Sequence, residues 1–113
     1  MKFRVSILPQ AQRDIDRNAV WWADHHSVAQ ALQWSDAVYD QIETLADCPE
    51  SHGLSTENDD FPFEIRDKLL GLGPRPSDRA VFTIRDDTVY VLTVRRGSQH
   101  SVTPDQLARP PQA

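Results

Sequence analysis

The sequence predicts an α+β fold with an N-terminal strand, a two-helix antiparallel hairpin and a C-terminal three-strand meander that completes a largely antiparallel sheet. Two observations predict it. Apolar residues recur at helical spacing between residues 9 and 48, and they alternate at strand spacing between residues 63 and 94. The 113 residues fit one domain, which we place at residues 1–104, followed by a loose tail at residues 105–113.

The first elements are a strand and a helix. Residues 3–8 largely alternate apolar and polar side chains and predict a short strand, after which Pro9 suits the first turn of a helix. We expect this helix to end near His25, and its apolar stripe comprises Ala11, Ile15, Ala19 and Trp22.

A second helix forms the other arm of the hairpin. Ser27 is suited to cap it, and the helical period continues to the stop at Cys48-Pro49. Trp21 and Trp34 fall off the main apolar stripes, which makes them candidates for a protein–protein contact.

A loop at residues 50–60 leads into the strands. Alternating patterns predict strands at residues 63–70 and 79–85, and Asp86-Asp87 forms a tight turn. Residues 88–94 are apolar on both faces, as in a central strand. We expect the helical hairpin to cover one face of this sheet and the arginines to occupy the other face or one rim.

Charge is segregated along the chain. Residues 1–62 contain four Lys or Arg and eleven Asp or Glu, whereas residues 63–103 contain seven and five, within a formal net charge of −5. A local excess of positive charge on an acidic protein indicates association with an anionic partner.

The candidate binding residues are the cations of the predicted strands. We expect them to converge on one concave surface, with Arg79 and Arg96 at exposed strand positions; the set is Arg66, Lys68, Arg79, Arg95 and Arg96. Guanidinium groups bind phosphate in a bidentate manner and also clamp acidic protein segments. For any one arginine a solvated strand face is the simpler interpretation, but the cluster as a whole favours a partner surface.

An RNA-cleaving site would need a general base or acid in addition to these cations. His100 is the candidate, because imidazole titrates near neutral pH. The spacing of His25, His26, Cys48 and His52 matches no usual zinc arrangement, so we expect no metal. Because the sequence has no phosphate-cradling glycine loop and no dinucleotide fingerprint, we also expect no cofactor.

The sequence also favours a cytoplasmic location. A single cysteine, Cys48, cannot form an internal disulfide and fits a reducing compartment. No run of about 18 apolar residues is present, so no membrane span is expected.

Several segments together resemble the RelE/ParE superfamily of toxins from bacterial type II toxin–antitoxin systems. The resemblance extends over residues 3–100 and is carried by residues 3–11, 14–15, 63–66, 79–84 and 86–97. It implies a growth-inhibiting toxin that a cognate antitoxin holds inactive, in a hetero-oligomer in which the C-terminal segment of the antitoxin wraps the toxin.

Two mechanisms occur in that superfamily. RelE-like members cut messenger RNA in the ribosomal A site, usually with a tyrosine shortly after the last strand. Under this alternative the resemblance implies phosphate binding by Arg66, Lys68, Arg79 and Arg96, with His100 as a substitute for the tyrosine. Val102 stands near the expected tyrosine position, and the tyrosines of this chain are Tyr39 and Tyr90. An acidic chain is also a poor electrostatic match for ribosomal RNA.

ParE-like members poison DNA gyrase without known catalysis of their own and tend to have a longer helical hairpin. The long hairpin, the missing tyrosine and the low pI of about 5.2 favour this branch and a non-enzymatic inhibitor. A third alternative is a degenerate member that keeps the fold and antitoxin binding but has lost toxicity.

Overall fold

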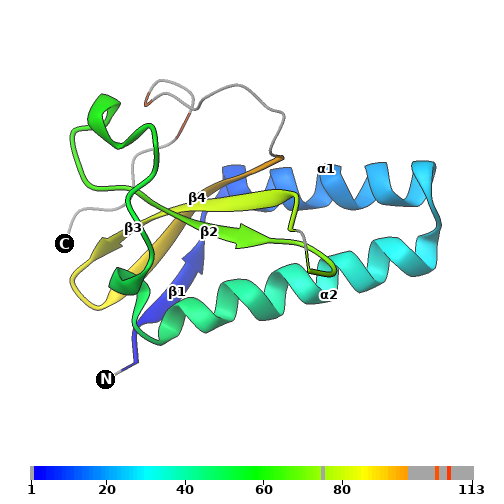
Figure 1. Cartoon of the computed structure of the whole chain (residues 1–113), viewed down its shortest axis with the longest axis horizontal. Coiled ribbons are helices and arrows are strands. Elements are labelled where there is room, and N and C mark those ends of the chain that lie inside the picture. The colour runs from blue at the N-terminus through cyan, green and yellow to red at the C-terminus, as the bar shows by residue number, and fades with distance from the viewer. Residues whose placement is uncertain (1, 75, 97–103, 105–106, 108–113) are drawn as a thin grey trace.

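The computed structural model describes residues 2–74, 76–96, 104 and 107 (Figure 1). Its helices and strands follow the predicted order: β1 (Arg4–Ile7), α1 (Pro9–His25), α2 (Val28–Glu43), β2 (Arg66–Leu70), β3 (Asp78–Arg85) and β4 (Thr88–Arg96). Short 3-10 turns occupy Thr44–Ala46, Pro49–Ser51 and Asn58–Asp60. Because none of the described helices combines enough length with enough apolar character, none is a candidate to cross a bilayer.

The four strands are arranged in the order β1-β4-β3-β2. The pairs β2/β3 and β3/β4 are antiparallel, whereas β1 runs parallel to β4. The prediction of a largely antiparallel sheet with a central last strand is therefore confirmed. The register shifts between Val81 and Phe82, which pair with Thr93 and Val91, so Leu92 is the extra residue of a β-bulge.

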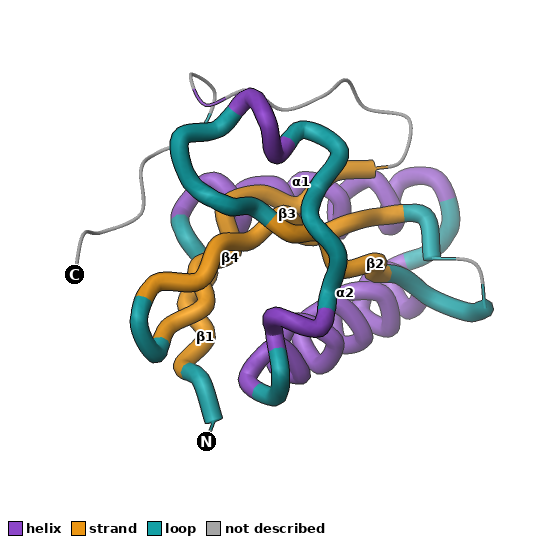
Figure 2. The backbone as a smooth tube through the Cα atoms, turned by 60° about the vertical axis from the view of Figure 1, so that its left-hand side comes forward, coloured by secondary structure: helices purple, strands orange, loops and turns teal. Residues whose placement is uncertain are grey.

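The helical hairpin covers one face of the sheet, as predicted. Figure 2 shows both helices on one side of the strands, with the connection after α2 crossing on the other side. The core beneath the hairpin joins both helices to three of the strands; its buried members include Ala11, Ile15, Val38, Ile42, Ala80, Phe82, Val89 and Val91.

The opposite face of the sheet is not open, which corrects our expectation. A second apolar cluster, called the second core below, lies there between the sheet and the connection from α2 to β2. It consists of Phe61 and Ile65 of the connection and Val81 and Leu92 of the sheet. The connection covers this face because its own apolar residues pack onto the sheet instead of forming a solvated loop. The arginines therefore do not share an exposed sheet face.

Trp34 does not mark a protein–protein contact. Its side chain is 0% exposed within the main core, and its Nε1 donates to Oδ2 of Asp78 at 3.1 Å. A buried indole needs an acceptor for its N–H, and Asp78 supplies it. The buried stripe of α2 passes through Trp34, whereas Val28 and Leu32, which fit the apolar helical spacing, are exposed.

Two predicted boundaries shift, and one cap is confirmed. Ser27 accepts a hydrogen bond from the backbone N of Gln30 at 3.0 Å, so it caps α2 as expected. The helix ends at Glu43, earlier than predicted, and continues as a 3-10 turn. The strand predicted from residue 63 begins at Arg66, because Ile65 bonds through its backbone to Asn58 and Ser55 of the preceding connection.

Candidate functional site

The register of the sheet determines which face each predicted binding residue occupies. Arg66 lies opposite Phe82 and Lys68 lies opposite Ala80, and these two partners belong to the core beneath the helices. Because paired residues point to the same face and neighbours along a strand alternate, Arg66 and Lys68 lie on the helix-covered side of the sheet.

The remaining cations divide between the two faces. Arg79 lies opposite Leu69 on β2 and Arg95 on β4, which places Arg79 and Arg95 on the side of the second core. Arg96 pairs with Asp78 and returns to the helix-covered side. The predicted convergence of all five residues on one concave surface is therefore wrong.

Arg79 is not at an exposed position, contrary to our expectation. Its side chain is 16% exposed and binds Glu57 at two points, with Nη1 2.8 Å from Oε2 and Nη2 3.1 Å from Oε1. Nη1 also donates to Oδ2 of Asp67 at 3.0 Å and to Oγ of Ser55 at 3.2 Å. Arg79 thus fastens the connection between α2 and β2 to the sheet.

The charges of this network reinforce one another. Burial alone would raise the pKa of Glu57, but hydrogen bonds from Arg79, Thr56 and Ser55 outweigh it and hold the pKa below its ordinary value. Burial would likewise lower the pKa of Arg79, but its contacts with Glu57 and Asp67 raise it. Both groups are charged in the folded protein at neutral pH.

Arg96 closes a stack of flat side chains at the end of β4. Its guanidinium carbon lies 3.8 Å from the ring centroid of Trp21, a cation–π contact. The indole of Trp21 in turn stacks on His25, with centroids 4.4 Å apart and planes inclined by 17°. A cavity of about 230 Å³ adjoins the stack and is lined by Asp14, Arg17, Asn18, Trp21, Val94 and Arg96.

Asp14 holds α1 against β4 beside this cavity. β1 pairs with β4 as far as Val91, and beyond that point the Asp14 carboxylate accepts from the backbone N of Val94 at 3.2 Å and from the Thr93 hydroxyl. Its other oxygen accepts from Arg17 Nη2 at 2.5 Å. Asp14 is buried although it carries a carboxylate, and the apolar pattern of the helix carries no signal for this burial.

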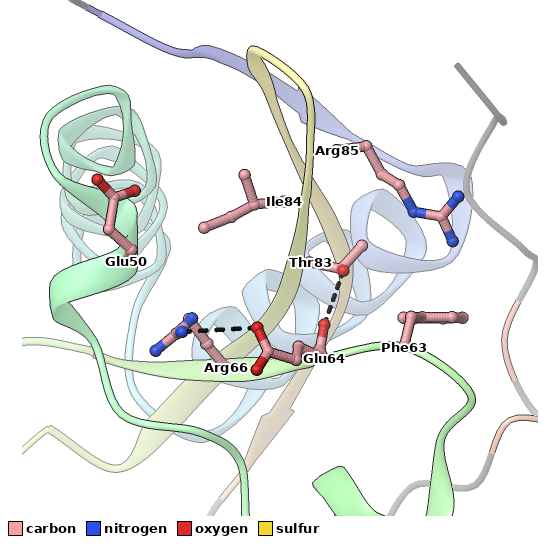
Figure 3. Close-up of a pocket in the computed structure, with 7 residues that line it drawn as sticks. All are labelled: Glu50, Phe63, Glu64, Arg66, Thr83, Ile84 and Arg85. Atoms are coloured by element: carbon pink, nitrogen blue, oxygen red, sulfur yellow. Dashed lines mark hydrogen bonds and ion pairs between the residues drawn. The ribbon is translucent and has the colours of Figure 1, made fainter.

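A second cavity lies near the other end of the sheet. It measures about 380 Å³ and is lined by Glu50, Phe63, Glu64, Arg66, Thr83, Ile84 and Arg85 (Figure 3). Arg66 and Arg85 approach it from different strands, and the Arg85 guanidinium lies 5.2 Å from the centroid of the Phe63 ring. Nη2 of Arg66 is 3.8 Å from the Glu64 carboxylate.

His52 is a candidate functional residue that the sequence pattern did not reveal, since it was considered only as a metal ligand. Burial and the nearby charges of Lys68 and Arg66 lower its pKa. The imidazole is therefore neutral at neutral pH. The predicted general base, His100, lies outside the described residues.

Two further kinds of site considered from the sequence are a metal site and a catalytic tyrosine. Within the described ranges, no three His, Cys, Asp or Glu side chains come together as metal ligands. The Tyr39 hydroxyl accepts from Gln12 Nε2 at 2.5 Å between the helices, and Tyr90 packs against the second core. Both tyrosines therefore serve the packing of the fold.

Comparison with known proteins gives one family and one fold. Residues 5–100 match the family described as the ParE toxin of the type II toxin–antitoxin system parDE. A chain of a solved structure titled "Chromosomal ParDE TA system from P. aeruginosa" superposes with a TM-score of 0.69 at 17% identity, covering 84% of this chain and 96% of that one. No curated protein matches at a significant level.

Proposed function

Because the chain belongs to the ParE family of toxins from type II toxin–antitoxin systems, we propose that it inhibits growth by acting on DNA gyrase and that a cognate antitoxin neutralises it. The match over residues 5–100 carries this proposal. It spans both helices and all four strands except the first residue of β1, so it involves the whole described fold rather than a shared motif.

The cations that remain on the surface of this fold are the proposed contact residues. Arg66, Lys68, Arg95 and Arg96 are half-buried, so part of each side chain remains exposed. We assign them to binding of the antitoxin and the target. Arg79 supports that surface from within, because Glu57 and Asp67 neutralise its charge.

A messenger-RNA endoribonuclease of the RelE type is the alternative function. Its usual tyrosine has no counterpart, since Tyr39 and Tyr90 are engaged in packing. The net charge of −5 also opposes the approach of ribosomal RNA. Both observations favour non-enzymatic inhibition.

One induction experiment separates these functions. The protein is expressed without its antitoxin in the cytoplasm, and gyrase supercoiling and DNA breakage are compared with messenger-RNA cleavage in a translating extract. Loss of supercoiling with intact messenger RNA is the expected result. Codon-dependent cleavage would instead identify the endoribonuclease, and normal growth with neither effect would identify a degenerate member.

The antitoxin is tested separately. Co-expression with the product of the adjacent reading frame is expected to restore growth and to yield a hetero-oligomer on size-exclusion chromatography. Growth arrest that persists in the presence of a stable complex would contradict neutralisation by that product.

A further inference from the structure

The outer edge of β2 brings together basic side chains that are separated in sequence. Leu54 forms an antiparallel bridge with Arg66, and the flanking backbone bonds are Ser55 N to Ile65 O at 2.8 Å and Asp67 N to Gly53 O at 3.2 Å. Extended by two residues, this antiparallel register brings His52 to the level of Lys68. Positions two apart share a face, so His52, Arg66 and Lys68 lie on the same side.

Two contacts hold His52 in this place. Its ring packs edge-on against Phe82 with centroids 5.9 Å apart, and Phe82 is the cross-strand partner of Arg66. Its backbone carbonyl accepts a hydrogen bond from Arg66 Nη1 at 2.5 Å. The imidazole and the guanidinium are therefore positioned together, and the charge of Lys68, two residues further along β2, acts on the same imidazole.

The cluster carries more positive than negative charge. The charged groups that act on the imidazole are Lys68 and Arg66. The nearest carboxylate to Arg66 is that of Glu64, which is 72% exposed and 3.8 Å from Nη2, beyond hydrogen-bond distance. In the described part of the chain, Lys68 has no acidic partner at ion-pair distance.

We propose that His52, Arg66 and Lys68 form a binding site for a phosphate group. A neutral imidazole offers one N–H, and the ammonium offers a mobile point charge. The guanidinium, whose Nη1 donates to the His52 carbonyl, retains N–H donors on Nη2. A phosphate monoester carries close to two negative charges at neutral pH, which match the two cations Arg66 and Lys68, whereas a carboxylate carries one. The site goes beyond the proposed gyrase inhibition and does not depend on it.

Two sources could supply the phosphate: a small phosphorylated molecule such as a nucleotide, or the backbone of DNA. The chemistry of the three donors is the same for both. The acidic remainder of the chain, which gives a net charge of −5, limits the site to one or a few phosphates rather than a long track along a duplex.

The direct test is an NMR titration of the full chain with inorganic phosphate at constant ionic strength, with chloride as the reference anion. The His52 ring resonances are expected to shift in a saturable way, and the pKa of His52 is expected to rise, because a bound anion favours the imidazolium form. His25 serves as the internal control, since it stacks on Trp21 in a different contact set. An unchanged His52 at saturating phosphate would overturn the proposal.

Variants locate the site. Lys68→Gln is expected to weaken phosphate binding about tenfold, and Lys68→Arg is expected to retain most of it, because the charge remains. Lys2→Gln removes the same charge from an exposed position near Asp86 and Asp87 and is the matched control. Equal weakening by Lys68→Gln and Lys2→Gln would show non-specific screening and contradict the site. Thermal unfolding of each variant verifies that the fold is intact.

The His52 ring resonances also distinguish the two possible sources of the phosphate group. Adenosine monophosphate and a short DNA duplex are titrated in parallel, and tighter binding of one of them identifies the source while supporting the phosphate chemistry. A shift with a glutamate-rich peptide but not with inorganic phosphate would overturn the proposal in favour of an acidic protein partner.

Discussion

Arg79 and Glu57 are joined at two points across 22 residues of sequence, one on β3 and the other on the connection that covers the second core. With 16% and 7% of their side chains exposed, both charges are largely withdrawn from water. Removing one partner of such a pair is strongly destabilising, because the other partner then remains as a buried, uncompensated charge.

Arg79→Gln is therefore expected to destabilise the protein by about 2–4 kcal/mol, since it leaves Glu57 and Asp67 without their cation. Urea unfolding measures the change. Arg13→Gln, on the exposed side of α1, is the control and is expected to change stability by less than about 0.5 kcal/mol. Similar losses in both variants would contradict a structural role for Arg79.

Asp14→Asn is expected to cost about 1–3 kcal/mol, because the carboxylate that accepts from the Val94 amide and the Thr93 hydroxyl loses its charge. Hydrogen exchange at the Val94 amide is expected to accelerate in parallel. Asp16→Asn removes an exposed carboxylate two residues away and provides the comparison. Unchanged protection of Val94 would show that Asp14 does not hold this part of β4.

Trp34→Phe removes the indole N–H that donates a hydrogen bond to Asp78. It is expected to lower the free energy of unfolding by about 1–3 kcal/mol at neutral pH. Burial raises the pKa of Asp78 despite this hydrogen bond and the charge of Arg96, so folding stability falls as pH rises from 3.8 through the folded-state pKa. Because the variant stabilises the carboxylate less, its deficit is expected to be larger at pH 7 than at pH 4. Parallel unfolding curves at the two pH values test this, and an equal deficit would contradict the role of the hydrogen bond.

His52 makes the stability depend on pH near neutrality. Its folded-state pKa lies below the ordinary value of 6.5, because burial and the charges of Lys68 and Arg66 oppose protonation. As pH falls through 6.5, the unfolded chain binds the proton first, and stability decreases until the pH is below the folded-state pKa. The variant His52→Gln is expected to flatten this part of the stability profile, whereas His26→Gln, at an exposed position, serves as the comparison. If His52→Gln left the dependence of stability on pH unaltered, His52 would not be its cause.

Arg96→Glu is expected to weaken antitoxin binding at least about tenfold, because it reverses a charge at the rim of the proposed contact surface. The substitution also removes the contact with Trp21 and the positive charge that acts on Asp78, so urea unfolding of the variant is measured alongside binding. Arg13→Glu is the matched control, since Arg13 is exposed on α1 and lies outside the proposed contact residues. Calorimetric titration with the antitoxin measures the affinity of both variants. An equal loss of affinity in the two would contradict a role of Arg96 in antitoxin binding.

The order and type of the elements could be predicted from the sequence because apolar spacing reflects local geometry. The faces of the strands could not, since a slip of one residue inverts every side chain and the bulge at Leu92 introduces such a slip within β4. The burial of Arg79 depends on Glu57, and the position of His52 depends on Phe82 and Arg66; both relationships are tertiary. Trp34 was misplaced because a small error in the phase of α2 exchanges its buried and exposed rows.

The parallel pairing of β1 with β4 also has a consequence for synthesis. Arg4 pairs with Thr88, 84 residues later, and β4, which lies between β1 and β3, is the last of the described strands in sequence. A nascent chain therefore holds its first strand without this neighbour until residues 88–91 have been made, and contacts of such long range are slow to form. A chain that terminates before β4 lacks the middle of its sheet, so premature termination is expected to yield unfolded fragments rather than partial toxins.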